Sequence, residues 1–245
     1  MAEYRTVRAD AQVQGAEIDA GLRAHMNKVY GTMSVGLAVT AGVAWAFGTS
    51  PALFALLRNP ETFQPNILGY IVMFAPLIMV FAFGAMINRL SAAGAQLFFY
   101  AFAAVMGVSI SWIFAAFTGF SIAQTFLVTS IAFAGLSLYG YTTKKDISGW
   151  GAFLIMGVIG LIVASIVNIF LQSPAIMFAI SALGVLIFAG LTAYDTQKIK
   201  NDYLMHAQAM DSEWLGKSAI MGALNLYLDF INMFMFLLQF LGNRN

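Results

Sequence analysis

One carboxylate of this chain lies in the middle of an apolar segment, between two asparagines. The segment NLYLDFIN holds Asn225, Asp229 and Asn232, and its other residues are apolar or aromatic. A charged side chain costs roughly 3 kcal/mol or more at the centre of a bilayer, so such a residue is rarely kept without a function. Asp229 is therefore a functional candidate, whereas the two asparagines alone are typical of hydrogen bonds between helices and could line a pathway.

Two further charged residues border apolar segments, and each on its own is typical of a solvated helix end. Asp195 lies in GLTAYDTQKIK and Arg89 in GAMINRLS. Two carboxyl groups that meet where water is scarce cannot both ionise cheaply, so Asp195 and Asp229 would share one proton. Arg89 would compete as a counter-ion for one of them. Together the three residues predict a pH-sensitive latch, a sensor or gate on movable helices.

The composition of the chain indicates whether these residues lie in a soluble or a membrane protein. The chain is 60% hydrophobic and 9% charged, far from the balance of a soluble domain. Charge-free runs at 62–88, 90–143 and 147–194 are long enough for one or two spans of about 20 residues each. The sequence therefore predicts an all-α, multi-pass membrane protein whose first partner is the lipid bilayer.

Other classes of site are excluded or disfavoured by composition. There is no cysteine, and the net charge is +1, so neither a zinc–thiolate site nor a nucleic-acid surface is expected. The two histidines, His25 and His206, lie in segments that look polar, which disfavours a histidine metal centre inside the membrane. No cofactor is expected.

Seven transmembrane helices are predicted, preceded by a polar cytoplasmic arm at 1–27 and forming one domain at 28–245. The first three spans are expected at 28–48, 66–89 and 91–117. A fourth span follows a turn after the third and ends near residue 142, and the last three are expected at 148–171, 174–195 and 218–240. Pro51, Pro60 and Pro65 predict a loop after the first span, and a polar loop is expected at 196–217. Asp195 would thus end the sixth helix.

The distribution of basic residues predicts the orientation. With the N-terminus inside, ten of the twelve lysines and arginines fall in inner segments, as the positive-inside rule requires. The N-terminus is therefore expected to be cytoplasmic and the C-terminus outside. At about 100° per residue, the polar residues of the last helix form one stripe, and a stripe that avoids lipid makes this helix central.

Calcium could pass this site but is not expected to be stored there. It takes about six to eight oxygen ligands, and the interior offers Asp195, Asp229, Asn225 and Asn232 besides carbonyl groups and water. A weak, transient calcium site at the two aspartates suits a leak path, because conduction requires release as well as entry.

Three segments resemble the Bax inhibitor-1 family, also called the transmembrane Bax inhibitor motif family. FAGLTAYDTQKIK at 188–200 and LNLYLDFINMF at 224–234 are similar to its two C-terminal signatures, and GLRAHMNKVYGTM at 21–33 to the start of its bacterial members. The resemblance covers essentially the whole chain. It implies six helices wrapped around a central seventh, and a place in the bacterial inner membrane.

The resemblance also implies a function. Family members are associated with pH-dependent calcium leak, and bacterial members carry a di-aspartyl pH sensor with an arginine partner, matched here by Asp195, Asp229 and Arg89. An acidic residue that a calcium-conducting bacterial member has in its second helix is missing from 66–89. The resulting expectation is a pH-sensitive calcium leak channel or transporter that is not an enzyme.

Two alternatives remain open. Some relatives regulate a membrane protease or bind cell-death proteins, so this chain could act by binding a membrane-protein partner, with the arm at 1–27 as the place to look. Aspartyl intramembrane proteases also have YD on one helix and an aspartate on the next. Their second aspartate follows Gly-x-Gly, whereas Asp229 follows LYL, which argues against that reading.

Overall fold

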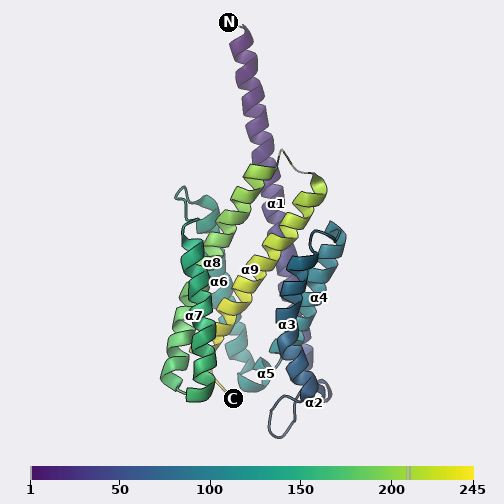
Figure 1. The fold of residues 1–245 in the computed structure, drawn as a ribbon, viewed down its shortest axis with the longest axis vertical. Helices are drawn as coiled ribbons and strands as arrows, with labels where there is room; N and C mark the ends of the chain where they lie inside the picture. The colour runs from purple at the N-terminus through teal and green to yellow at the C-terminus, as the bar shows by residue number, and fades with distance from the viewer. Residues whose placement is uncertain (1, 208, 210) are drawn as a thin grey trace.

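The computed structural model describes the backbone of residues 2–207, 209 and 211–245, and the side chains of these residues from 17 onward. The described part is helical and contains no strand. Its helices are α1 (Ala2–Thr49), α2 (Pro51–Leu57), α3 (Ile67–Met86), α4 (Ala92–Ile110), α5 (Ile113–Ala116), α6 (Gly119–Thr142), α7 (Trp150–Leu171), α8 (Pro174–His206) and α9 (Ser212–Leu241) (Figure 1).

Seven of the described helical segments are long and apolar enough to cross a membrane. They are Glu17–Thr49, Ile67–Met86, Ala92–Ala116, Gly119–Thr142, Trp150–Leu171, Pro174–His206 and Ser212–Leu241. The prediction of an all-α membrane protein with seven spans is confirmed.

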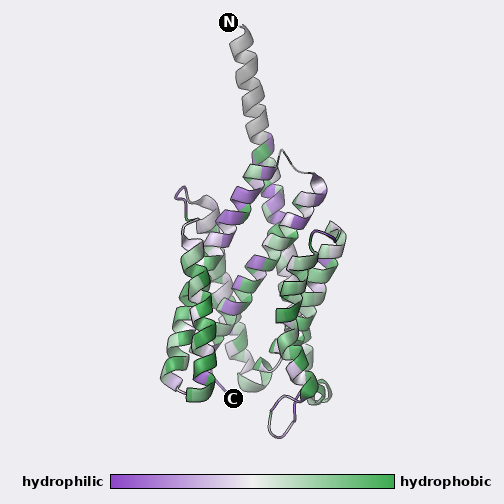
Figure 2. Ribbon diagram, in the orientation of Figure 1, coloured by the Kyte–Doolittle hydropathy of each residue, from purple (hydrophilic) through white to green (hydrophobic). Residues whose placement is uncertain are grey.

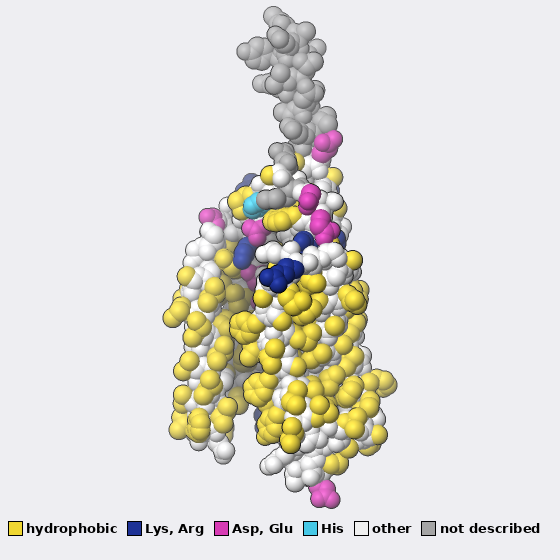
Figure 3. Space-filling view, turned by 45° about the vertical axis from the view of Figure 1, so that its right-hand side comes forward, with side chains coloured by type: hydrophobic (Ala, Val, Ile, Leu, Met, Phe, Trp, Pro, Cys, Tyr) yellow, Lys and Arg dark blue, Asp and Glu magenta, His cyan; other side chains and the backbone are white. Residues whose placement is uncertain are grey.

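The two ends of the bundle differ in charge. The turns after α3, α6 and α8 lie at the end next to the N-terminal helix, and the C-terminus lies at the opposite end (Figure 1). In Figure 3, most charged side chains gather at the former end, above a broad belt of hydrophobic side chains. The basic residues therefore group as expected, and the placement of this end in the cytoplasm stays a prediction.

Short polar side chains start most of the spans. Asn66, Ser91, Thr118, Ser173 and Asp211 each accept a hydrogen bond from the backbone N–H three residues further on. Such N-caps satisfy one of the amide groups that the first turn of a helix leaves unpaired. Ser173 caps α8, and Pro174 occupies its first helical position, where the missing N–H of proline costs no hydrogen bond.

The last helix is the centre of the bundle. In α9, 61% of the most apolar window is buried inside the protein, compared with 39% in α1 and 11% in α3. It packs on α1, α4, α6 and α8, while α3 packs mainly on α4 and α7 mainly on α8. Figure 2 shows hydrophilic residues along α9 and the upper half of α8, whereas α3 and α7 are almost uniformly hydrophobic.

The predicted loop at 196–217 is wrong. Helix α8 continues to His206 and α9 begins at Ser212, so Asp195 lies about three turns before the end of its helix. Charged and amide residues made this stretch look like a loop, but lysine and glutamine are good helix formers. The buried side chains of Ile199 and Tyr203 hold the extension against the bundle.

Three other boundaries differ from the expectation. The predicted loop after the first span contains the short helix α2, capped by Ser50 and anchored by the buried Phe54 and Leu57. The third span is divided into α4 and α5. Helix α1 begins at Ala2, so it runs through the expected boundary at residue 28; the side chains of the first 16 residues of the predicted arm lie outside the described part.

Candidate functional site

Helices α8 and α9 run antiparallel and approach each other closely along their length. Near one end, Ser181 donates a hydrogen bond to Gln239 (3.5 Å). Further along, a methyl group added to Gly222 would lie 3.0 Å from Cδ1 of Ile199. Between these contacts the two helices carry Asp195 and Asp229, so the register of the pair brings the two carboxyl groups together.

The carboxyl groups of Asp195 and Asp229 face each other within hydrogen-bonding reach. A hydrogen bond between two carboxyl groups requires that one of them carries a proton. Asp229 is only 4% exposed and Asp195 is half-buried. In the described part of the chain, no permanent donor reaches Oδ2 of Asp229, so a shared proton is the group that can satisfy this atom.

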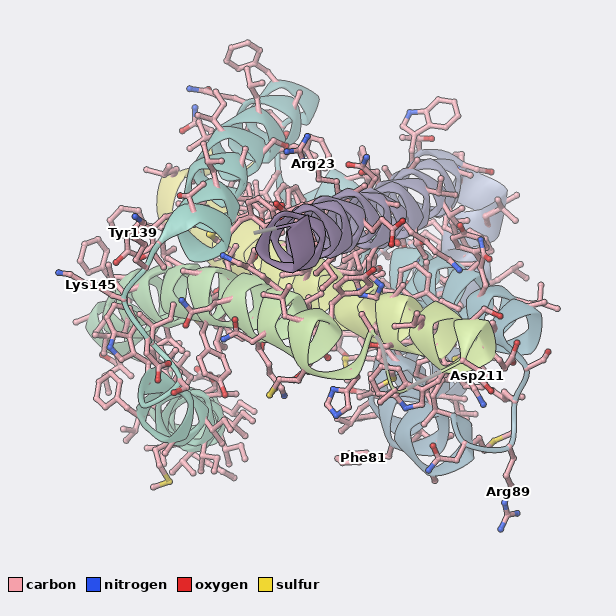
Figure 4. The ribbon with its side chains drawn as sticks, turned by 90° about the horizontal axis from the view of Figure 1, so that it is seen from above. Arg23, Phe81, Arg89, Tyr139, Lys145 and Asp211 are labelled. Atoms are coloured by element: carbon pink, nitrogen blue, oxygen red, sulfur yellow. The ribbon has the colours of Figure 1, made fainter. Side chains whose placement is uncertain are left out.

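Charged neighbours of the pair are few. Lys198, one turn further along α8, is exposed, and its positive charge attracts the carboxyl group of Asp195. Arg89 follows the end of α3 and is exposed, and in Figure 4 its side chain points away from the bundle. The structure therefore brings the two predicted aspartates together and leaves the predicted arginine outside their contact.

The two asparagines have different surroundings. Asn232 donates a hydrogen bond to the carbonyl of Leu228 in its own helix (2.8 Å), which is a local, structural contact. Asn225 is half-buried one turn before Asp229. Among the described residues, no group of three or more acidic or histidine side chains could hold a metal ion, so the pair is not part of a conventional metal cage.

Two chains of hydroxyl groups were not expected from the sequence. In one, Tyr227 of α9 shares a hydrogen bond with Thr40 of α1 (2.6 Å), and Thr40 donates to the carbonyl of Ala103 in α4 (2.8 Å). In the other, Ser137 of α6 contacts both Tyr30 of α1 (2.6 Å) and Thr196 of α8 (3.0 Å).

The second chain ends on α8 at Thr196, which follows Asp195 in sequence and points toward α6. A signal for it exists in α6, where Ser121, Thr125, Thr129 and Ser137 recur at multiples of four residues and are all buried. Such a stripe indicates a helix face turned toward other helices. The second chain of hydroxyl groups therefore links α1, α6 and α8.

His25 does not lie on a solvated arm as its polar neighbours suggested. It is 7% exposed, and its ring lies 4.9 Å from that of Tyr203 on α8. The contact packs the start of the first span against the extended end of α8.

The bundle has seven spans, and its central helix carries the buried one of two facing carboxyl groups. These features define a multi-pass membrane protein with an internal ionisable site. The family model described as "Inhibitor of apoptosis-promoting Bax1" matches residues 22–245. The chain belongs to this family, and the resemblance in its sequence motifs is confirmed.

Bacterial relatives match along nearly the whole chain. "Inner membrane protein YbhL" of Escherichia coli K12 is 47% identical over 242 residues, covering 98% of this chain and 99% of that protein. An uncharacterized protein of Caulobacter vibrioides is 45% identical, covering 93% and 91%, and one of Deinococcus radiodurans is 37% identical, covering 98% and 99%. With its seven spans, the chain is a multi-pass protein of the bacterial inner membrane.

Proposed function

We propose that this protein is a pH-sensitive leak path for cations, with calcium as the transported ion and the Asp195–Asp229 pair as its gate. The observation that carries the proposal is the meeting of two carboxyl groups on the central contact between α8 and α9, where one is almost fully buried. A contact that needs a proton to be satisfied is a contact that pH can change.

The electrostatics of the pair are large enough to move helices. With one shared proton, the two carboxyl groups attract each other and tie α8 to α9. When that proton leaves to water, two like charges face each other. For two unit charges at a separation of about 4 Å and an effective dielectric constant near 20, the repulsion is about 4 kcal/mol. An energy of this size changes an equilibrium between two helix arrangements by about a thousandfold.

Calcium suits such a path as a passing ion. The freed carboxylates, together with the side-chain oxygen of Asn225, offer oxygen ligands of the kind that calcium prefers, in a number too small for tight binding. Arg89 is left out of the gate, since its side chain is exposed on the outside of the bundle.

The test is calcium flux into proteoliposomes loaded with a calcium-sensitive dye. Purified wild-type protein should raise the flux above that of empty liposomes, and the flux should change between acidic and neutral pH. Asp229→Asn cannot lose a proton, so its flux should be the same at every pH and equal to the acidic limit of the wild type. A wild-type flux equal to that of empty liposomes at every pH would overturn the proposal.

Asp146→Asn is the matched control. Asp146 is exposed in the turn between α6 and α7, and hydrogen bonds from the side chain and the backbone N–H of Ser148 hold its pKa below the ordinary value of an aspartate. Its carboxyl group is therefore ionised throughout the range from about pH 5 to 8. Asp146→Asn should keep the full pH response of the wild type, and a loss there would separate the response from the buried pair.

A further inference from the structure

A groove open toward the lipid runs between α1 and α6, two helices that make hardly any direct contact. It consists of three adjoining cavities of about 540, 310 and 400 Å³. The first two share Met33, Ser34 and Phe133 in their walls, and the last two share Leu37 and Phe126. We call this continuous feature the α1–α6 groove, and its floor is formed in part by Phe230 of α9.

The two ends of the α1–α6 groove differ in chemistry. Arg23, Asn27 and Tyr141 line its upper end, and Figure 4 shows Arg23 beside the space between α1 and α6. Below them, the hydroxyl groups of Tyr30 and Ser137 bond to each other. The remaining walls are almost entirely aliphatic and aromatic. A ligand that fits has an anionic, hydrogen-bonding head and an apolar tail.

The groove is at least as long as one leaflet of a bilayer. Below Tyr30 its apolar part follows α1 as far as Trp45, a stretch of about 22 Å at 1.5 Å per residue. The hydrocarbon core of a bilayer is about 30 Å thick, so this stretch reaches past the middle of the core. Arg23 lies about two turns above Tyr30, where a lipid headgroup would be.

We infer that the α1–α6 groove binds one phospholipid, with its phosphate held near Arg23 and an acyl chain lying along the apolar walls. Arginine suits this role because its guanidinium group pairs with phosphate through two parallel hydrogen bonds. The upper cavities have the volumes of small-molecule sites. The inference does not depend on the proposed cation leak.

The first test is native mass spectrometry of the purified protein, titrated with phosphatidylglycerol and with diacylglycerol carrying the same two chains. The wild type should hold one phosphatidylglycerol molecule more tightly than the diacylglycerol. Ala134→Trp fills the upper cavity from α6 and should weaken phosphatidylglycerol binding at least about tenfold. Ala152→Trp, at an exposed position of α7, is the matched control and should bind like the wild type.

Arg23→Gln tests the contribution of the lipid headgroup to binding separately from that of the acyl chains. Losing one charge-assisted contact should weaken phosphatidylglycerol binding by about tenfold and leave diacylglycerol binding unchanged. Lys144→Gln, which removes an exposed positive charge at the same end of the bundle, should change neither. If Ala134→Trp does not fold, Ala38→Trp on the opposite wall replaces it.

Three results would overturn the inference. One is a wild type that retains no phospholipid. Another is retention that both groove-filling variants leave intact. A third is equal binding of phosphatidylglycerol and diacylglycerol, which would remove the role of Arg23. If filling the groove instead dissociates a dimer without loss of lipid, a second copy of the chain occupies this face.

Discussion

Two faces of the central helix α9 differ in how their buried polar side chains are hydrogen-bonded. On the face toward α1 and α4, the hydroxyl group of Tyr227 bonds to Thr40, which in turn donates to the carbonyl of Ala103. Two residues further along, on the face toward α8, Asp229 meets Asp195, and its Oδ2 atom has no permanent donor in the described part of the chain.

The contact of Tyr227 with Thr40 is a structural one, whereas the contact of Asp229 with Asp195 depends on protonation. The hydroxyl chain is neutral and satisfied at any pH between acid and neutral, so it holds three helices in a fixed arrangement. The carboxyl pair is satisfied only while it holds a proton. We therefore expect substitutions on the first face to change stability and substitutions on the second to change the response to pH.

The largest effect is expected at Tyr227, whose side chain is completely buried and packs edge-on against Phe99 and Phe102. Tyr227→Ala should lower the free energy of unfolding by about 3–5 kcal/mol, because it empties a large, well-packed site. Tyr227→Phe should lower it by only about 1 kcal/mol, since Thr40 keeps its bond to Ala103. Unfolding in detergent, followed by tryptophan fluorescence, measures both.

Tyr139→Ala is the control for this pair of variants. Tyr139 is 45% exposed on α6, so its removal should change the free energy of unfolding by less than about 0.5 kcal/mol. Equal losses in Tyr227→Phe and Tyr227→Ala would mean that the hydroxyl link, rather than the packing of the ring, holds α9 to α1 and α4.

An intermediate effect is expected at Asp229. Asp229→Asn should lower the free energy of unfolding by less than about 1 kcal/mol, because the amide can donate to Asp195 as a protonated carboxyl group does. Asp229→Ala should lower it by about 1–3 kcal/mol, because it leaves Asp195 without its partner. The same unfolding measurement applies, and a loss in Asp229→Asn as large as in Tyr227→Ala would make the pair a structural contact.

The sequence predicted one of these two faces and missed the other. The polar stripe of the last helix indicated that it is central and that Asp229 points inward, because period and hydropathy are local properties of the chain. The contact of Tyr227 with Thr40 joins residues 187 positions apart. No local pattern says which of several threonines on α1 faces a given tyrosine, so this contact required the structure.

The wrong helix end at Asp195 and the groove, about which the sequence made no prediction, have different physical causes. Asp195 was expected at a helix end because charge was taken to mark the end of a helix, whereas helix propensity and the burial of Tyr203 continue α8 beyond it. The α1–α6 groove arises because two neighbouring helices fail to pack against each other, and the apolar composition of each helix is the same whether lipid or protein covers it.

The smallest effect is expected at the first turn of α9, where it touches the start of α4. Oε1 of Glu213 accepts a hydrogen bond from the backbone N–H of Ala92 at the start of α4 (2.6 Å), where the helix dipole favours a negative charge. Glu213→Ala should lower the free energy of unfolding by up to about 1 kcal/mol, since the site is exposed. Glu213→Gln keeps an acceptor and should lose less.

Salt distinguishes this contact from both faces of α9. An exposed charge is screened at high ionic strength, so the difference between Glu213→Ala and the wild type should shrink when unfolding is measured at about 1 M salt instead of about 0.1 M. The differences for the buried Tyr227 variants should stay the same. Glu61→Gln, an exposed position in the loop between α2 and α3, is the control. A Glu213→Ala loss that is independent of salt would mean that the side chain acts by packing, and that α9 is fixed at its first turn as firmly as at Tyr227.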